Sequence, residues 1–265
     1  MTTRQAGTGE GNSDSAIKDL KEQVAHSCRI LYDLGLMTYL GHVTVRIPGT
    51  DRLLLGFNRY TYGNTTADDI LTFDMDAKKV DGPDVLLPYE TFIYTETLKI
   101  RPDMNSVIHL HMPVSLAFGV ARREILPLYI HHSEVLRFGL PTVDNPLLAS
   151  TVDRGQSIAR ALKEAYACHM RGHGQVIVGR SVDHATALTL QLEEQAKMNL
   201  LASQLSPNPQ PCTQTEVEEF IYEHSRTPFN STIEPYSAIR SEIPGVDAGH
   251  LAFLSRELKE RKSKQ

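Results

Sequence analysis

Apolar residues recur at steps of three and four positions between Asp14 and Gly35, the spacing of one face of an α-helix. They are Ile17, Leu20, Val24, Cys28, Leu31 and Leu34. Gly35 follows the last of them, and a glycine there is typical of a helix end. Residues 1–14 carry glycine, serine, threonine and charge with almost no apolar side chain, so we expect a flexible tail there.

Three short β-rich runs follow this helix, at residues 42–47, 52–55 and 70–74. The sequences PGTD and YGNTTADD separate them, and these contain the residue types of turns. The pattern therefore predicts a β-meander.

Helical and strand patterns then alternate. The predicted helices cover residues 89–100, 114–120, 154–168 and 183–205, and the predicted strands cover 106–111, 126–131 and 175–178. Arg101-Pro102 closes the first of these helices. We expect one α/β domain over residues 15–205, an α/β/α sandwich whose central sheet is mainly antiparallel.

The segment 206–265 reads as a C-terminal extension. PNPQPC breaks the preceding helix, and TQTEVEEFIYEH predicts a short capped helix before an irregular end that contains several prolines. We expect this extension to pack on the domain or on a neighbouring subunit.

Composition narrows the functional classes. With 265 residues, 41% of them hydrophobic, the chain can bury a sizeable core. Its 27 basic and 32 acidic residues give a net charge of −5, which argues against a nucleic-acid partner. The cysteines at 28, 168 and 212 form no CxxC pair, and no stretch approaches the roughly 20 apolar residues of a membrane span. These features favour a cytoplasmic protein with no membrane partner.

Three histidines suggest a metal centre. His109 and His111 are two positions apart on a predicted strand, so their side chains share one face and could bind one ion. His173 lies between two glycines, which let its ring reach a shared centre. Three imidazoles would leave an open coordination position, as catalytic sites do. The alternatives are a structural histidine pair and a plain turn histidine.

Glu90 begins the predicted helix that precedes the histidine pair, and the helix dipole there favours a charged carboxylate. A surface carboxylate in the first turn is the alternative. Glu90 is part of a longer pattern, E-x18-H-x-H with a third histidine 62 residues later. This pattern favours a site that includes Glu90.

Three segments resemble the class II aldolase/adducin family of sugar-phosphate aldolases and epimerases, related decarboxylases and the adducin head domain. They are LGLMTYLGHVTVRIPG, KIRPDMNSVIHLH and the stretch that begins MRGHGQVIVG, and the likeness covers about residues 18–205. It implies the family fold, a divalent metal (Mn²⁺, Zn²⁺, Fe²⁺ or Co²⁺) on His109, His111 and His173, and Glu90 as acid/base. It also implies a homo-oligomer, usually a tetramer, with active sites between subunits.

The phosphate-binding elements of the sugar-phosphate members are altered here. The loop GFNRY puts Asn58 and Arg59 where small residues are expected, Tyr89 stands in place of a serine, and His42 replaces an asparagine after glycine. Arginine can grip a carboxylate with two hydrogen bonds, and tyrosine can pack on a ring. We therefore expect a small-molecule carboxylate substrate, although each of these residues could also be a plain loop or packing residue.

The forms GHVTVR and RGHG resemble the family's decarboxylases of hydroxylated aromatic dicarboxylates, such as dihydroxyphthalate. We therefore expect a carbon–carbon lyase in aromatic degradation, in which a metal stabilises an enolate charge and Glu90 delivers a proton to carbon. Tyr222 matches the place of a C-terminal tyrosine that enters a neighbour's site in family aldolases, or it is a packing residue. Rival functions are a sugar-phosphate aldolase or epimerase, an adducin-like module without catalysis, and an iron-dependent oxygenase.

Overall fold

The computed structural model describes residues 10–58 and 61–226 of the 265. The α-helices are α1 (Glu10–Asp33), α2 (Thr91–Ile100), α3 (Pro113–Ala121), α4 (Val152–Leu162), α5 (Val182–Leu205) and α6 (Gln214–Arg226). The strands are β1 (His42–Arg46), β2 (Arg52–Gly56), β3 (Ile70–Asp74), β4 (Lys79–Asp81), β5 (Ser106–Leu110), β6 (Thr142–Val143), β7 (Ala167–Met170) and β8 (Gly174–Gly179). No helix in these two ranges is long and apolar enough to cross a membrane.

The eight strands form one sheet in the order β4-β3-β2-β1-β5-β8-β7-β6. Every neighbouring pair is antiparallel except β6 and β7, which are parallel. The central strands β5 and β8 are buried along their whole length. The prediction of an α/β fold with a mainly antiparallel sheet is confirmed.

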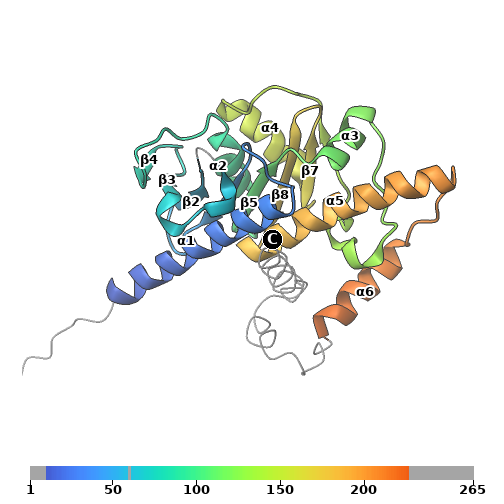
Figure 1. Ribbon diagram of the computed structural model, residues 1–265, viewed down its shortest axis with the longest axis horizontal. Helices are drawn as coiled ribbons and strands as arrows, with labels where there is room; N and C mark the ends of the chain where they lie inside the picture. Colours follow the sequence, from blue (N-terminus) through green and yellow to red (C-terminus); the bar gives the residue numbers. More distant parts are fainter. Residues whose placement is uncertain (1–9, 59–60, 227–265) are drawn as a thin grey trace, which may run out of the picture.

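Helices cover both faces of the sheet. In Figure 1, α1 and α5 lie in front of the strands and α2 and α4 lie behind them. Two glycines show how tightly these layers pack. A Cβ on Gly56 of β2 would overlap the Cys28 sulfur of α1, and one on Gly155 of α4 would overlap the Phe92 carbonyl of α2. The fold therefore has no room for side chains at these two contacts.

The ends of the domain differ in detail from the prediction. Helix α1 begins at Glu10, inside the predicted flexible tail 1–14, and it ends just before Gly35, whose φ is +72°. In the extension 206–265, α6 forms with the predicted cap, since Glu216 accepts from the Thr213 amide at 2.7 Å and Thr213 accepts from the Glu216 amide at 3.2 Å. Residues 1–9 and 227–265 lie outside the described part of the chain.

The predicted strand at residues 126–131 is wrong. The segment makes a tight turn in which the Leu128 amide donates to the Leu126 carbonyl at 2.8 Å, its backbone pairs with two amide side chains of α5, and it then enters a 3₁₀ helix, η3 (Ile130–His132). Gln195 accepts from the amides of Leu128 and Tyr129 at 3.2 Å and donates to the Tyr129 carbonyl at 2.6 Å. Asn199 accepts from and donates to Leu126 at 2.8 and 2.7 Å. These side chains take the place of a neighbouring strand.

We expect Gln195→Ala to lower the free energy of unfolding by about 2 to 4 kcal/mol, because it removes the partners of several backbone groups. Gln195 is fully buried. Urea denaturation of the purified protein measures the change. Glu194→Ala is the matched control on the same helix, since Glu194 is partly exposed and bonds only Lys197 among the contacts described. A loss no larger than that of the control would contradict this role for Gln195.

The predicted helix at residues 154–168 is too long. Helix α4 ends at Leu162, because Lys163 takes a non-helical backbone with φ of +46° and ψ of −117°. Residues 167–170 then form β7, which is buried throughout. A lysine with positive φ has no sequence signature, since glycine is the residue that normally takes a positive φ at a helix end.

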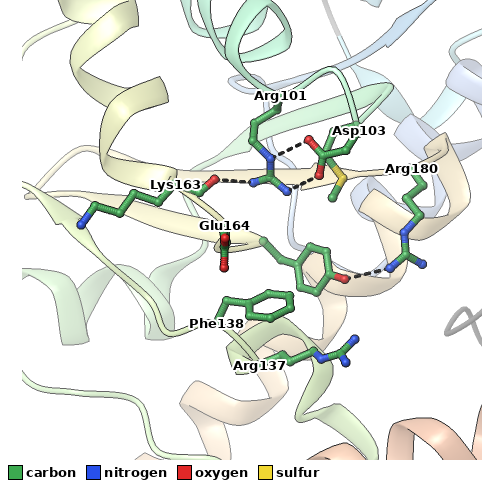
Figure 2. A pocket seen from close by; sticks show the side chains of 9 residues that line it. Arg101, Asp103, Arg137, Phe138, Lys163, Glu164 and Arg180 are labelled. Carbon is green, nitrogen blue, oxygen red and sulfur yellow. Dashed lines mark hydrogen bonds and ion pairs between the residues drawn. The ribbon is translucent and has the colours of Figure 1, made fainter.

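A cavity of about 520 Å³ lies at the start of β5, the end of that strand away from His109 (Figure 2). Arg101 forms part of its wall and bonds Asp103 twice, at 2.9 and 2.8 Å, and the carbonyls of Lys163 and Ala165, both at 2.9 Å. The hydrogen bond and charge of Arg101 also hold the pKa of Asp103 below its usual value. Through these bonds the Arg101 guanidinium links the end of α2 to the segment just before β7, so Arg101 supports the fold.

Candidate metal centre and active site

Three histidines on or beside the neighbouring strands β5 and β8 meet at one point. His109 lies on β5, His111 follows the end of that strand, and His173 lies in the turn between β7 and β8. One nitrogen from each ring lies within 4.8 Å of the other two. The predicted strand 106–111 therefore ends one residue early, but its last histidine still lies beside the first.

Backbone carbonyls orient two of the rings. His109 Nδ1 lies 2.9 Å from the Gln175 carbonyl, and His173 Nδ1 lies 3.1 Å from the Pro146 carbonyl. A carbonyl can only accept, so both Nδ1 atoms carry hydrogen and donate it. The Nε2 atoms then face the site with a free lone pair when the rings are neutral, which is the usual arrangement of metal-binding histidines.

The donor set fits a divalent cation. His109 Nε2 and His111 Nδ1 are buried without a hydrogen-bond partner among the described residues. Burial, and then the neighbouring His109, lowers the pKa of His111 to about 4, so this ring is neutral at pH 7. Unpaired buried nitrogens are costly, and a cation would satisfy them. Three protein ligands leave room for substrate, unlike a closed structural site.

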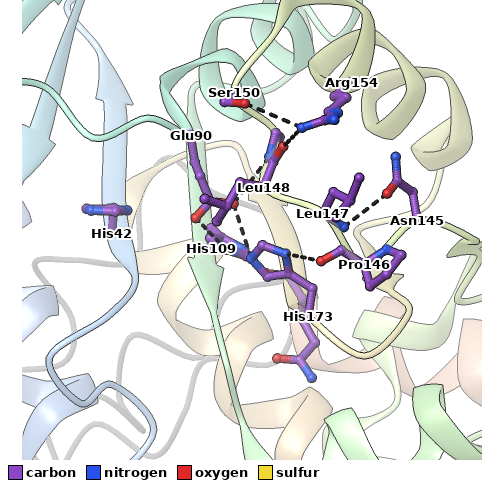
Figure 3. A network of polar contacts seen from close by, with 12 residues as sticks. His42, Glu90, His109, Asn145, Pro146, Leu147, Leu148, Ser150, Arg154 and His173 are labelled. Atoms are coloured by element: carbon purple, nitrogen blue, oxygen red, sulfur yellow. Dashed lines mark hydrogen bonds and ion pairs between the residues drawn. The ribbon is translucent and has the colours of Figure 1, made fainter.

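Glu90 faces the same point from the N-terminus of α2 (Figure 3). Its Oε1 lies 3.1 Å from His173 Nε2, and its Oε2 lies 3.4 Å from His109 Nε2. Burial alone would raise the pKa of Glu90, but the Nε2 atoms of His109 and His173 face the carboxylate, and when these rings are protonated their contact and charge outweigh burial and hold the pKa well below its usual value. The carboxylate is therefore ionised and can accept a proton.

His42 lies at the side of this centre, because it is the cross-strand partner of His109. Its Nδ1 is 2.8 Å from the Tyr94 hydroxyl, and its ring stacks on Phe57 with 5.9 Å between centroids. Burial first, and then the charge of His109, lower the pKa of His42 to about 3. His42 is therefore a neutral, buried aromatic wall beside the histidines.

The other sequence candidates lie in different settings. Tyr89 is next to Glu90 and is 79% exposed. Asn58 accepts from the Thr61 amide at 3.3 Å, so it supports its own loop, and Arg59 falls outside the described residues. Tyr222 lies on α6, and Figure 1 shows this helix away from β5 and β8. The chain thus brings together Glu90, His42 and the three histidines, and it does not bring Tyr222 to them.

Sequence reasoning missed the backbone groups that hold the site. The Gln175 and Pro146 carbonyls orient two histidines, and the Ala149 amide donates to Glu90 Oε1 at 3.4 Å. Since every residue has a carbonyl, residue type gives no signal for such contacts. One signal was available in the sequence, because Gln175 is a polar residue in an otherwise apolar strand. Its buried side chain bonds both the amide and the carbonyl of Met112, next to His111.

Comparisons with known proteins show similarity in both sequence and fold. The chain is 27% identical to a 3,4-dihydroxyphthalate decarboxylase of Rhodococcus jostii (strain RHA1) over 200 residues, 71% of this chain and 82% of that protein. It is 28% identical to the enzyme of the same name from Arthrobacter keyseri over 192 residues, 68% and 77% of the two chains. The solved structure of L-fuculose 1-phosphate aldolase from Glaciozyma antarctica PI12 is similar in fold, with a TM-score of 0.70, 21% identity and coverage of 84% and 86%. Residues 22–200 match the family described as Class II Aldolase and Adducin N-terminal domain, and the chain belongs to that family.

Proposed function

We propose that this protein is a metal-dependent decarboxylase of a hydroxylated aromatic dicarboxylate such as a dihydroxyphthalate. The observation that carries the proposal is the wall beside the histidines. Where sugar-phosphate members are expected to hold phosphate, the buried ring of His42 stacks on Phe57 and bonds Tyr94. A neutral aromatic wall suits a flat ring better than it suits a phosphate dianion. The two relatives named as dihydroxyphthalate decarboxylases support the same substrate class.

In the proposed reaction His109, His111 and His173 would hold a divalent ion, which would act as a Lewis acid for the negative charge that develops when a carbon–carbon bond breaks. Glu90 acts as the proton carrier. Its ionised carboxylate takes the proton of the substrate's ring hydroxyl and returns it to the ring carbon that bears the leaving carboxylate. The bond to that carboxylate then breaks, its electron pair restores the aromatic ring, and carbon dioxide leaves. The product has one carboxylate fewer.

A sugar-phosphate aldolase or epimerase is the competing function, because the same centre could stabilise the charge formed when a ketose phosphate is cleaved. The fold likeness to the fuculose-phosphate enzyme fits both functions. A non-catalytic adducin-like module would have no need of three converging histidines and a buried carboxylate. The intact cluster therefore favours an enzyme.

We also propose a cytoplasmic homo-oligomer, such as a tetramer, with sites at subunit borders. The support is a group of exposed apolar side chains on the segments next to Glu90 and His173. They are Leu86, Tyr89, Leu147 and Leu148, with exposed fractions of 89, 79, 55 and 48%. A neighbouring subunit would cover such side chains, and a role for Tyr222 would then fall in a neighbour's site.

A substrate panel tests the proposed function. Purified protein, loaded with Mn²⁺, Zn²⁺, Co²⁺ or Fe²⁺, is mixed with hydroxylated phthalates, with pyridine dicarboxylates and with ketose phosphates. We expect the ultraviolet spectrum of at least one aromatic dicarboxylate to change and its product, identified by NMR, to lack one carboxylate. Cleavage of a ketose phosphate, with every aromatic acid unchanged, would replace the decarboxylase by the aldolase. Consumption of oxygen with an aromatic acid would point to the oxygenase.

A further inference from the structure

We propose that residues 145–150 form a clamp that fixes His173 and Glu90 relative to each other, and that Arg154 is the positioning residue that holds this clamp. The clamp crosses the site between β6 and α4, and Figure 3 shows its contacts. The inference rests on the metal centre of the proposed function and is independent of which substrate is used there.

The first contact of the clamp sets the ring of His173. The Pro146 carbonyl accepts from His173 Nδ1 at 3.1 Å, and this bond both selects the tautomer and turns Nε2 toward Glu90. His173 needs this support because it lies in a turn beside Gly172, whose φ is +68°. Displacing Pro146 would free the ring to rotate away from His109 and His111.

The second contact sets Glu90. The Ala149 amide donates to Glu90 Oε1, the same oxygen that faces His173. Glu90 makes no side-chain cap for its own helix, so its carboxylate is held from outside α2. Ala149 itself is fully buried, which limits how far this amide can move. Two residues of one segment, Pro146 and Ala149, thus reach the metal ligand His173 and the acid/base Glu90.

Arg154 ties the clamp to α4. Its Nη1 donates to the Leu148 carbonyl at 2.8 Å and to Ser150 Oγ at 3.4 Å, the residues on either side of Ala149. Its own amide donates to the Thr151 hydroxyl, which caps α4. At the other end of the clamp, Asn145 Oδ1 accepts from the Leu147 amide at 3.0 Å. The arginine is only partly buried, so its removal opens no core cavity.

The test is the affinity of metal-free protein for Zn²⁺ alone, measured by titration against a chelating dye. We expect Arg154→Ala to weaken Zn²⁺ binding about tenfold, the lower end of the loss seen when an outer partner of a ligand is removed. Arg154→Lys should recover part of the loss, since an ammonium can still donate to the Leu148 carbonyl. Arg160→Ala is the matched control, because Arg160 lies on the exposed side of the same helix and bonds only Gln156 among the contacts described.

Several outcomes would overturn the clamp. One is an Arg154→Ala variant that binds Zn²⁺ as tightly as the wild type. Another is an Arg160→Ala variant that loses as much Zn²⁺ affinity as Arg154→Ala does. If Arg154→Ala fails to fold, Asn145→Ala decides at the other end, where unchanged affinity again contradicts the proposal. Because the titration contains no substrate, it tests the clamp even if the protein proves to be an aldolase. Where a turnover assay exists, kcat should fall more than KM changes, since Glu90 would be misplaced.

Discussion

Replacing Glu90 with glutamine is expected to lower kcat by about 10³-fold, within the range of general acid–base catalysis, while the metal content stays near that of the wild type. Glutamine has the shape of glutamate and can still accept from the Ala149 amide. It cannot take a proton from the substrate and return it to carbon. Turnover of the aromatic dicarboxylate measures the loss, and elemental analysis of the same protein measures the metal.

Glu96→Gln is the control for this prediction. Glu96 is a second buried carboxylate of α2, but its oxygens bond Lys99 at 2.6 Å and Gln156 at 3.1 Å, away from the histidines. We expect this variant to keep its kcat. If Glu90→Gln turned over as fast as Glu96→Gln, the proton would move by another route and Glu90 would lose its assigned role.

Removing one of the three histidines is expected to abolish both metal binding and turnover. His111→Ala or His173→Ala leaves two imidazoles, and an ion held by two neutral ligands binds more weakly by orders of magnitude. His111 is a partly buried residue that follows β5, and His173 lies in a turn, so the protein should still fold without either ring. We expect elemental analysis to fall from about one metal per subunit to near zero after dialysis against a chelator.

His26→Ala provides the comparison, because His26 is an exposed histidine of α1 outside the cluster. It should retain both metal and activity. The pair of results separates two roles, since Glu90→Gln keeps the metal and loses turnover, whereas the histidine variants lose both. Full metal content in His111→Ala and His173→Ala would mean that the converging rings do not form the binding site.

Much of the fold could be predicted because its elements repeat with a clear period. The apolar steps of α1, the glycine after it and the Arg101-Pro102 stop of α2 each act within a few residues, and each was found in place. The errors arose where a distant partner decides the structure. Residues 126–131 have the composition of a strand, but Gln195 and Asn199 of α5 supply their hydrogen bonds.

The site could be predicted only in part, for a related reason. The sequence shows His109, His111, His173 and Glu90 through their type and spacing, and the structure brings these four together. The carbonyl of Pro146 and the amide of Ala149 belong to residues without polar side chains, so no pattern marks them. The role proposed for Arg154 can be recognised only from its hydrogen bond to the segment 145–150 in the structure.

The most direct test of the central claim is carbon dioxide release by one protein preparation, before and after its metal is removed and returned. We predict about one carbon dioxide per aromatic dicarboxylate consumed by the metal-loaded protein, almost none from the metal-free protein, and recovery when a divalent ion is added back. The release should depend on His173 and Glu90. Equal release with and without metal, or release that survives the loss of His173, would contradict the account of this centre.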